Sequence, residues 1–145
     1  MTVSPRSLSI GDELPPFDLA VTTTLIVAGA LASRDFMPVH HDRDFAQAQG
    51  APDVFMNILS TNGYVARFVT DWAGPEAMLR SIRIRLGTQA TPGQVLRFRG
   101  AVTDLQPKGD ETWIQVTLRA ENPQGAHATG TVELSLRSDP RPDGA

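Results

Sequence analysis

The sequence predicts an α+β domain in which a curved antiparallel sheet wraps around one long helix. Apolar residues recur at helical spacing over residues 54–72. From residue 77 onward they alternate with polar residues, which is typical of strands with one buried and one solvent-exposed face. A helix that is apolar around most of its girth has to be covered on several sides, so we expect the sheet to curl around it.

Four long strands are expected in the C-terminal half. Turn-forming residues at 91–93, 107–110 and 122–125 separate them. We therefore expect a four-strand antiparallel meander. Its apolar positions are Ile82, Ile84 and Leu86; Leu96, Phe98 and Val102; Ile114, Val116 and Leu118; and Val132, Leu134 and Leu136.

Shorter elements precede the long helix. Residues 17–23 predict a further strand. Thr24 is placed to cap a short helix over residues 25–33, and Asp42 to cap a second helix of one or two turns that ends near Gly50.

Length and composition predict one folded domain. The chain has 145 residues, of which 41% are hydrophobic and 20% charged, enough to bury a core. We expect the domain over residues 17–137. Residues 1–16 would form an N-terminal extension and residues 138–145 a flexible tail, both of them loose.

Composition also excludes several classes of function. The longest apolar stretch, residues 25–32, is too short to span a bilayer, and the first twelve residues lack the apolar core of a secretory signal. We therefore expect a cytoplasmic protein. The absence of cysteine excludes disulfides, iron–sulfur clusters and a cysteine nucleophile. A net charge of −3 argues against a nucleic-acid partner.

The densest run of titratable groups lies between the two short helices, at residues 34–46. Asp35 and His40 are five positions apart, and Pro38 between them stiffens the connection. A carboxylate and an imidazole together can orient and deprotonate a water, then return a proton to carbon. Adjacent His40 and His41 do not match the spacing of metal ligands on a helix face, so we expect no metal. We expect no cofactor either.

The run from Ser33 to His40 resembles the signature of MaoC-like dehydratases and R-specific enoyl-CoA hydratases. That signature reads Ser-Gly-Asp-x-Asn-Pro-(Leu/Ile/Val)-His-x5-Ala/Ser. The resemblance implies the family's hotdog fold over the whole domain. Residues 55–64 are further similar to a subgroup, the small subunits of actinobacterial steroid side-chain enoyl-CoA hydratases. The positions that match the signature in identity and spacing are Asp35, Pro38, Val39, His40 and Ala46.

The resemblance implies an enoyl-CoA hydratase, a lyase that reversibly adds water in syn fashion to a trans-2-enoyl-CoA. Asp35 and His40 would position and activate the water. A backbone N–H near the helix start, at residues 55–57, would hold the charge that develops on the thioester oxygen. The implied partners are an acyl-CoA substrate and a second hotdog subunit, identical or different. The expected substrate-binding residues are Met37, Phe55, Met56, Asn57 and Thr61.

The chain also departs from the family pattern. Arg34 stands where the family often has Gly, Met37 where it has Asn, and Phe55-Met56 where it has His-Gly. The apolar replacements suit a bulky acyl group such as a steroid, and equally an ordinary core.

Two more residues have open roles at this point. Thr61 aligns with the family's helix Ser, and its hydroxyl either serves the site or bonds its own helix carbonyl. His127 is expected on the surface.

Alternative functions remain open. One is a non-catalytic hotdog subunit that completes a partner's acyl-CoA tunnel, and another is a hotdog acyl-CoA thioesterase. The 13 cationic side chains include Lys only at Lys108. Arg holds phosphates with a bidentate fork. The arginines that could contact the CoA phosphates are Arg67, Arg83, Arg85, Arg97 and Arg99.

Overall fold

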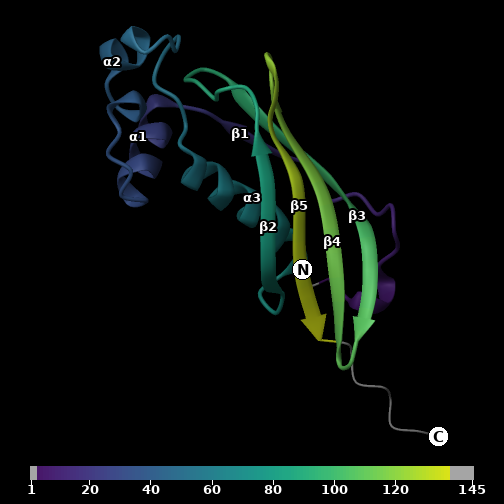
Figure 1. Cartoon of the computed structure of the whole chain (residues 1–145). Helices are drawn as coiled ribbons and strands as arrows, with labels where there is room; N and C mark the ends of the chain where they lie inside the picture. Colours follow the sequence, from purple (N-terminus) through teal and green to yellow (C-terminus); the bar gives the residue numbers. More distant parts are fainter. Residues whose placement is uncertain (1–2, 138–145) are drawn as a thin grey trace, which may run out of the picture.

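The computed structural model describes residues 3–137 and contains one five-stranded antiparallel sheet with a long helix against it (Figure 1). Two short helices lie together at one end of the sheet. Among the described residues, none of the helices is long and apolar enough to cross a membrane. The helices are α1 (Thr23–Ala32), α2 (Arg43–Ala48) and α3 (Ile58–Ala73), with 3-10 turns η1 (Pro5–Ser7) and η2 (Pro38–His40); the strands are β1 (Phe17–Ala20), β2 (Met78–Leu86), β3 (Val95–Lys108), β4 (Glu111–Asn122) and β5 (Gly125–Arg137).

The long helix begins later than its apolar pattern predicts. Asn57 is the N-cap of α3, and its side-chain oxygen accepts a hydrogen bond from the Ser60 N–H. The preceding Val54 and Met56 are buried although they are not helical. Apolar spacing marks a buried face, but the capping residue decides where a helix starts.

Each of the two short helices begins directly after a residue whose side chain caps it. Asp42 caps α2 as expected, because its carboxylate accepts from the Phe45 N–H. The predicted cap of α1 is wrong by two residues: Thr22, not Thr24, accepts from the Leu25 N–H. The strand before it is correspondingly shorter and ends at Ala20.

The strand order is β1-β3-β4-β5-β2, so the expected four-strand meander is only partly right. Strands β3, β4 and β5 are consecutive hairpin partners. Strand β2 pairs with β5 instead of β3, with Ile82 opposite Val132. Alternation fixes which face of a strand is buried, and it carries no information about which strand lies beside it.

The core lies between α3 and the sheet. Val65, Phe68 and Val69 of the helix are buried against the inward-facing strand residues. Phe98 of β3 is fully buried, with its ring centroid 5.9 Å from that of Phe68. Burying a side chain of this kind stabilises the fold by about 1.5–3 kcal/mol. A long helix covered by a curved antiparallel sheet is the arrangement expected of a hotdog fold.

We expected the N-terminal segment to be loose, but the structure shows it bound to the edge of the sheet. Gly11 and Leu14 donate backbone hydrogen bonds to Val102 and Gly100, and the side chain of Leu14 is buried. The segment therefore continues the edge of the sheet beyond β1. Its apolar contacts to the core, from Val3, Leu8 and Leu14, are irregularly spaced and gave no periodic signal. The predicted tail at 138–145 lies outside the described residues.

The opposite edge of the sheet is open. Within residues 3–137, β2 has a strand neighbour only on its β5 side. An exposed edge strand presents unpaired backbone groups to another chain.

Candidate active site

The structure brings Asp35 and His40 together in the connection between α1 and α2. Asp35 Oδ2 lies 3.3 Å from His40 Nε2. The backbone N–H of Asp35 donates to Ala30 at the end of α1, and η2 turns the chain so that His40 folds back. The predicted pair is therefore adjacent in space.

His40 is held in one orientation by Phe55. Its Nδ1 lies 2.7 Å from the Phe55 carbonyl oxygen, and the two rings meet edge to face with centroids 5.1 Å apart. Because a carbonyl only accepts, Nδ1 carries a hydrogen. Nε2 therefore faces the Asp35 carboxylate across 3.3 Å. An imidazole nitrogen and a carboxylate at this spacing can together bind a water molecule and exchange a proton with it.

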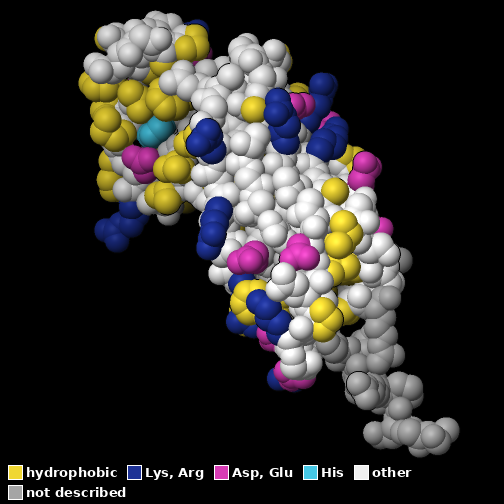
Figure 2. Space-filling model, turned by 45° about the vertical axis from the view of Figure 1, so that its right-hand side comes forward, with side chains coloured by type: hydrophobic (Ala, Val, Ile, Leu, Met, Phe, Trp, Pro, Cys, Tyr) yellow, Lys and Arg dark blue, Asp and Glu magenta, His cyan; other side chains and the backbone are white. Residues whose placement is uncertain are grey.

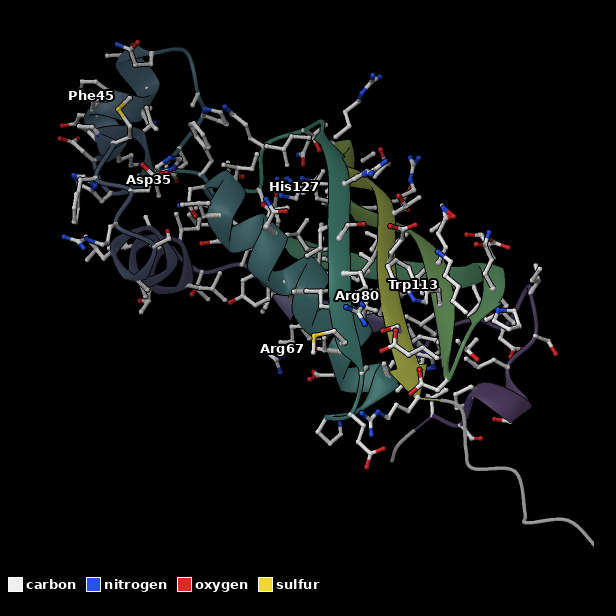
Figure 3. All side chains as sticks on the ribbon, turned by 60° about the horizontal axis from the view of Figure 1, so that its bottom comes forward. Asp35, Phe45, Arg67, Arg80, Trp113 and His127 are labelled. Atoms are coloured by element: carbon white, nitrogen blue, oxygen red, sulfur yellow. The ribbon has the colours of Figure 1, made fainter. Side chains whose placement is uncertain are left out.

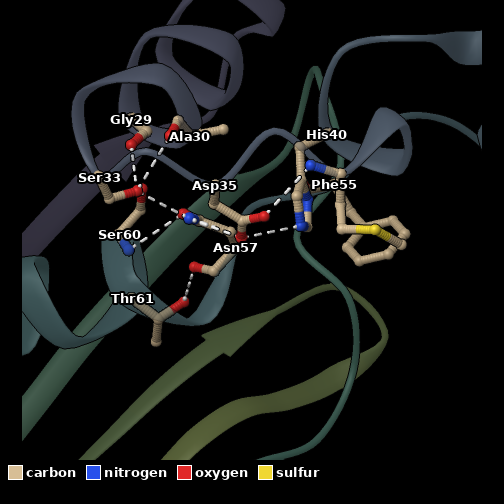
Figure 4. Close-up of polar contacts among 10 residues, drawn as sticks. Gly29, Ala30, Ser33, Asp35, His40, Phe55, Asn57, Ser60 and Thr61 are labelled. Carbon is tan, nitrogen blue, oxygen red and sulfur yellow. Dashed lines mark hydrogen bonds and ion pairs between the residues drawn. The ribbon is translucent and has the colours of Figure 1, made fainter.

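Asn57 holds the Asp35 carboxylate from below (Figure 4). Its side-chain amide donates to Asp35 Oδ2 at 3.1 Å and to the Ser33 hydroxyl at 2.9 Å. This hydrogen bond is the main reason that the pKa of Asp35 lies below its ordinary value; the Met37 N–H and His40 act in the same direction, against burial. Asp35 is therefore an anion near neutral pH.

Only one of the three expected backbone donors at the helix start is free. The Phe55 N–H donates to Val39 at 3.3 Å, and the Met56 N–H donates to Ala90 at 3.0 Å. The N–H of Asn57 has no hydrogen-bond partner in the part of the chain that the structure describes. It is the unpaired donor at the helix start, on a residue that is 1% exposed.

The expected substrate-binding side chains differ in how much they reach the surface. Met37 is 55% exposed, and Phe55 is half-buried against His40. Met56 belongs to the core, and Asn57 is buried with its amide committed to protein groups. Thr61 is 1% exposed, one helical turn beyond Asn57.

Large apolar side chains stand exposed at the end of the molecule that carries Asp35. Figure 2 shows hydrophobic side chains gathered over this end, and Figure 3 places Asp35 and Phe45 there together. Contiguous exposed apolar patches are typical of binding surfaces, so this end of the molecule is a candidate binding surface. We name the set the apolar rim; it comprises Leu31, Phe36, Met37, Phe45, Ile58 and Leu59.

Arg34 adopts a backbone conformation that favours glycine. Its φ is 57°, and among the described residues it is the one non-glycine residue with a positive φ. A side chain in this left-handed region costs about 1–2 kcal/mol. The position next to Asp35 is therefore one at which glycine fits without strain.

The prediction of a surface position for His127 is wrong. His127 is 3% exposed, its Nε2 lies 2.9 Å from the Thr61 hydroxyl, and its Nδ1 lies 2.7 Å from the Thr88 carbonyl oxygen. The register between β4 and β5 shifts beside this position, so both His127 and Ala128 turn inward. The signal that could have found it was Thr61, a hydroxyl on an apolar helix face.

No metal centre accompanies these groups in residues 3–137, where no three His, Asp or Glu side chains lie together in a suitable arrangement.

The chain is similar to a known family and to a known protein over most of its length. The model of a MaoC like domain matches residues 9–122. The beta subunit of 3-oxo-4,17-pregnadiene-20-carboxyl-CoA hydratase from Mycobacterium tuberculosis is 47% identical over 128 residues, which cover 88% of this chain and 96% of that subunit.

Two solved structures are similar over most of the chain. The ChsH1-ChsH2 complex from Mycobacterium tuberculosis matches with a TM-score of 0.84 and 47% identity, covering 89% of this chain and 98% of that one. The R-hydratase PhaJ1 from Pseudomonas aeruginosa matches with a TM-score of 0.81 and 19% identity, covering 95% and 88%. The second likeness establishes the hotdog fold.

Proposed function

The chain belongs to the MaoC-like domain family, and on that premise we propose that it is an enoyl-CoA hydratase that uses Asp35 and His40. The observation that carries the proposal is the Asp35–His40 pair, with 3.3 Å between Oδ2 and Nε2 and with the His40 tautomer set by Phe55. The similar Mycobacterium tuberculosis protein is a hydratase subunit.

The site supports a division of labour between the two side chains. Asp35, kept ionised by Asn57, orients the water, and His40 Nε2 accepts a proton from it. The water oxygen adds to C3 of the enoyl group, and His40 returns the proton that it took from the water to C2 on the same face. Negative charge develops on the thioester oxygen, where the free Asn57 N–H can donate. Dehydration is the reverse of these steps.

We propose further that a second hotdog subunit completes the site. The similar solved structure is a complex of two proteins. In this chain the β2 edge has no further strand neighbour in residues 3–137, and the apolar rim stands exposed beside Asp35. A partner over the rim would enclose an apolar acyl group, and the large exposed apolar side chains of the rim suit a bulky group such as a steroid.

Arg83 and Arg85 are the proposed contacts for the CoA phosphates. Arg67 is paired with Asp71, and Arg97 and Arg99 share Asp18. Arg83 and Arg85 are exposed on β2 and have no ion pair within residues 3–137.

Their strand also leads toward the site. The chain runs from β2 to Ala90, whose carbonyl accepts from the Met56 N–H beside Phe55.

One observation favours the alternative of a non-catalytic subunit that completes its partner's tunnel. Met56 replaces the family's glycine, and its N–H is already bonded to Ala90. If the Asn57 N–H does not take over this role, the chain lacks a donor for the thioester oxygen.

The test is a hydration assay that follows the loss of enoyl-thioester absorbance on short, long and steroidal enoyl-CoA substrates. The full chain is assayed alone and with a hotdog subunit encoded beside it. We expect Asp35→Asn and His40→Ala to abolish hydration, whereas His41→Ala, an exposed neighbour, keeps it. If the complex is active and both variants retain the full rate, the alternative function is correct.

A further inference from the structure

A buried polar pair joins α3 to β5 beneath the candidate site. Thr61 on the helix and His127 on the strand are 1% and 3% exposed, and Figure 3 shows His127 between the sheet and α3. The Asp35–His40 chemistry proposed above uses neither of them.

The direction of each hydrogen bond in the pair follows from its neighbours. The Thr88 carbonyl can only accept, so His127 Nδ1 carries the hydrogen of that 2.7 Å contact. Burial lowers the pKa of His127, against the bond to Thr88, so the ring is neutral and Nε2 bears a lone pair. Thr61 therefore donates its hydroxyl hydrogen to His127 at 2.9 Å instead of to the Asn57 carbonyl at 3.3 Å.

Such a pair does little for stability compared with apolar side chains of the same shape. A hydrogen bond between buried neutral groups replaces bonds that both groups made to water, and replacing both partners by apolar groups can be nearly neutral. What a satisfied buried pair supplies is a unique orientation. Here it fixes the first turn of α3 against the sheet.

That first turn carries the groups that hold Asp35. The Thr61 N–H donates to the Asn57 carbonyl, and the Asn57 side chain donates to Asp35. The carbonyl of neighbouring Phe55 orients His40. A displacement of the turn would change the distance between Asp35 and His40.

We propose that His127 is a positioning residue: through Thr61 it sets the first turn of α3, and thereby the geometry of Asp35 and His40. The proposal rests on the proposed hydratase function only where it predicts rates. Its structural part can be measured without substrate.

The test compares Thr61→Val, which removes the hydroxyl but keeps the shape, with Thr61→Ser, which keeps the hydroxyl. His127→Phe and the double variant with Thr61→Val complete a cycle. Thermal unfolding confirms that each variant is folded. We expect Thr61→Val to lower kcat about tenfold with KM within about twofold, and Thr61→Ser to stay close to wild type. The double variant should lose no more than the larger single loss.

The second readout is the pair of ring-nitrogen NMR resonances of His40 in the full chain. They should shift in Thr61→Val and stay in place in Thr61→Ser. Unchanged His40 resonances in Thr61→Val, or equal loss of rate in both threonine variants, would overturn the proposal. If wild type hydrates no enoyl-CoA either alone or with the second hotdog subunit, the proposed function fails, and the His40 resonances alone decide the positioning role.

Discussion

The side-chain amide of Asn57 donates to the Asp35 carboxylate at 3.1 Å, while the oxygen of the same amide caps α3. One buried residue thus fixes both the start of the long helix and the charge of the acidic group. Asn57 can do so because an amide offers donors and an acceptor together. The helix start and the candidate catalytic loop are therefore a single hydrogen-bonded unit.

Asn57→Asp should damage activity more than folding. The new carboxylate keeps an oxygen for the Ser60 N–H but faces Asp35 with a like charge, which raises the pKa of Asp35 and pushes it away. We expect a fall in hydration rate of at least about tenfold. Asn62→Asp is the matched control, because the Asn62 side chain bonds, among the described residues, only the Ile58 carbonyl of its own helix. Equal losses in the two variants would contradict the role of Asn57.

Substitutions of Arg34 should measure the backbone strain beside Asp35. At φ 57°, glycine is relaxed and alanine is not, so Arg34→Gly should be more stable than Arg34→Ala by about 1 kcal/mol. The measurement is the free energy of unfolding in urea. An alanine variant at least as stable as the glycine variant would show that the left-handed conformation costs nothing here.

Because of His127, the free energy of unfolding should decrease at acidic pH. Its folded-state pKa lies below the ordinary value of 6.5, so only the unfolded chain takes up a proton as the pH falls below 6.5. The stability is fully present above that value and declines toward the lower, folded-state pKa. One proton contributes at most about 1.4 kcal/mol per pH unit.

The check is the free energy of unfolding near neutral pH and at about pH 5.5 for wild type and His127→Phe. The wild type should lose more on acidification than the variant, since other titrating groups are common to both. Equal losses would mean that His127 titrates alike in both states.

Arg83 and Arg85 should contribute to binding of the CoA part of the substrate and not to binding of the rest. Replacing both by alanine should raise KM for an enoyl-CoA about tenfold through lost charge-assisted hydrogen bonds. KM for the corresponding pantetheine thioester, which lacks the nucleotide phosphates, should not change. Arg97→Ala with Arg99→Ala is the control, because both arginines are paired with Asp18. An equal rise in KM with the control would remove the assignment.

Local sequence patterns predicted which segments form strands better than they predicted which strands pair with each other. Alternation such as Ile114, Val116 and Leu118 identified strands correctly, because burial of one face is written into every second residue. The position of β2 beside β5 was not predictable in this way. It depends on how the sheet closes around α3, which is a property of the whole chain.

In the candidate site, too, contacts between residues close in sequence were predictable, and contacts between distant residues were not. Asp35 and His40 lie close in sequence, so a stiff connection between them could be foreseen. Asn57 was expected to touch substrate, yet its amide is bonded to Ser33 and Asp35, residues more than twenty positions away. His127 lies still farther along the chain, and its partner Thr61 comes from a different element. Contacts over such separations leave no periodic signal.

The apolar rim and the residues that hold the Asp35–His40 pair are different sets. Asn57, Phe55 and Ser33 fix Asp35 and His40 from the protein interior, whereas Phe36, Phe45 and Ile58 stand outside in solvent. Rim side chains can therefore be exchanged for others without disturbing the hydrogen bonds behind them. Under the proposed hydratase function, substitutions in the apolar rim would change which acyl group is accepted and leave the Asp35–His40 geometry in place.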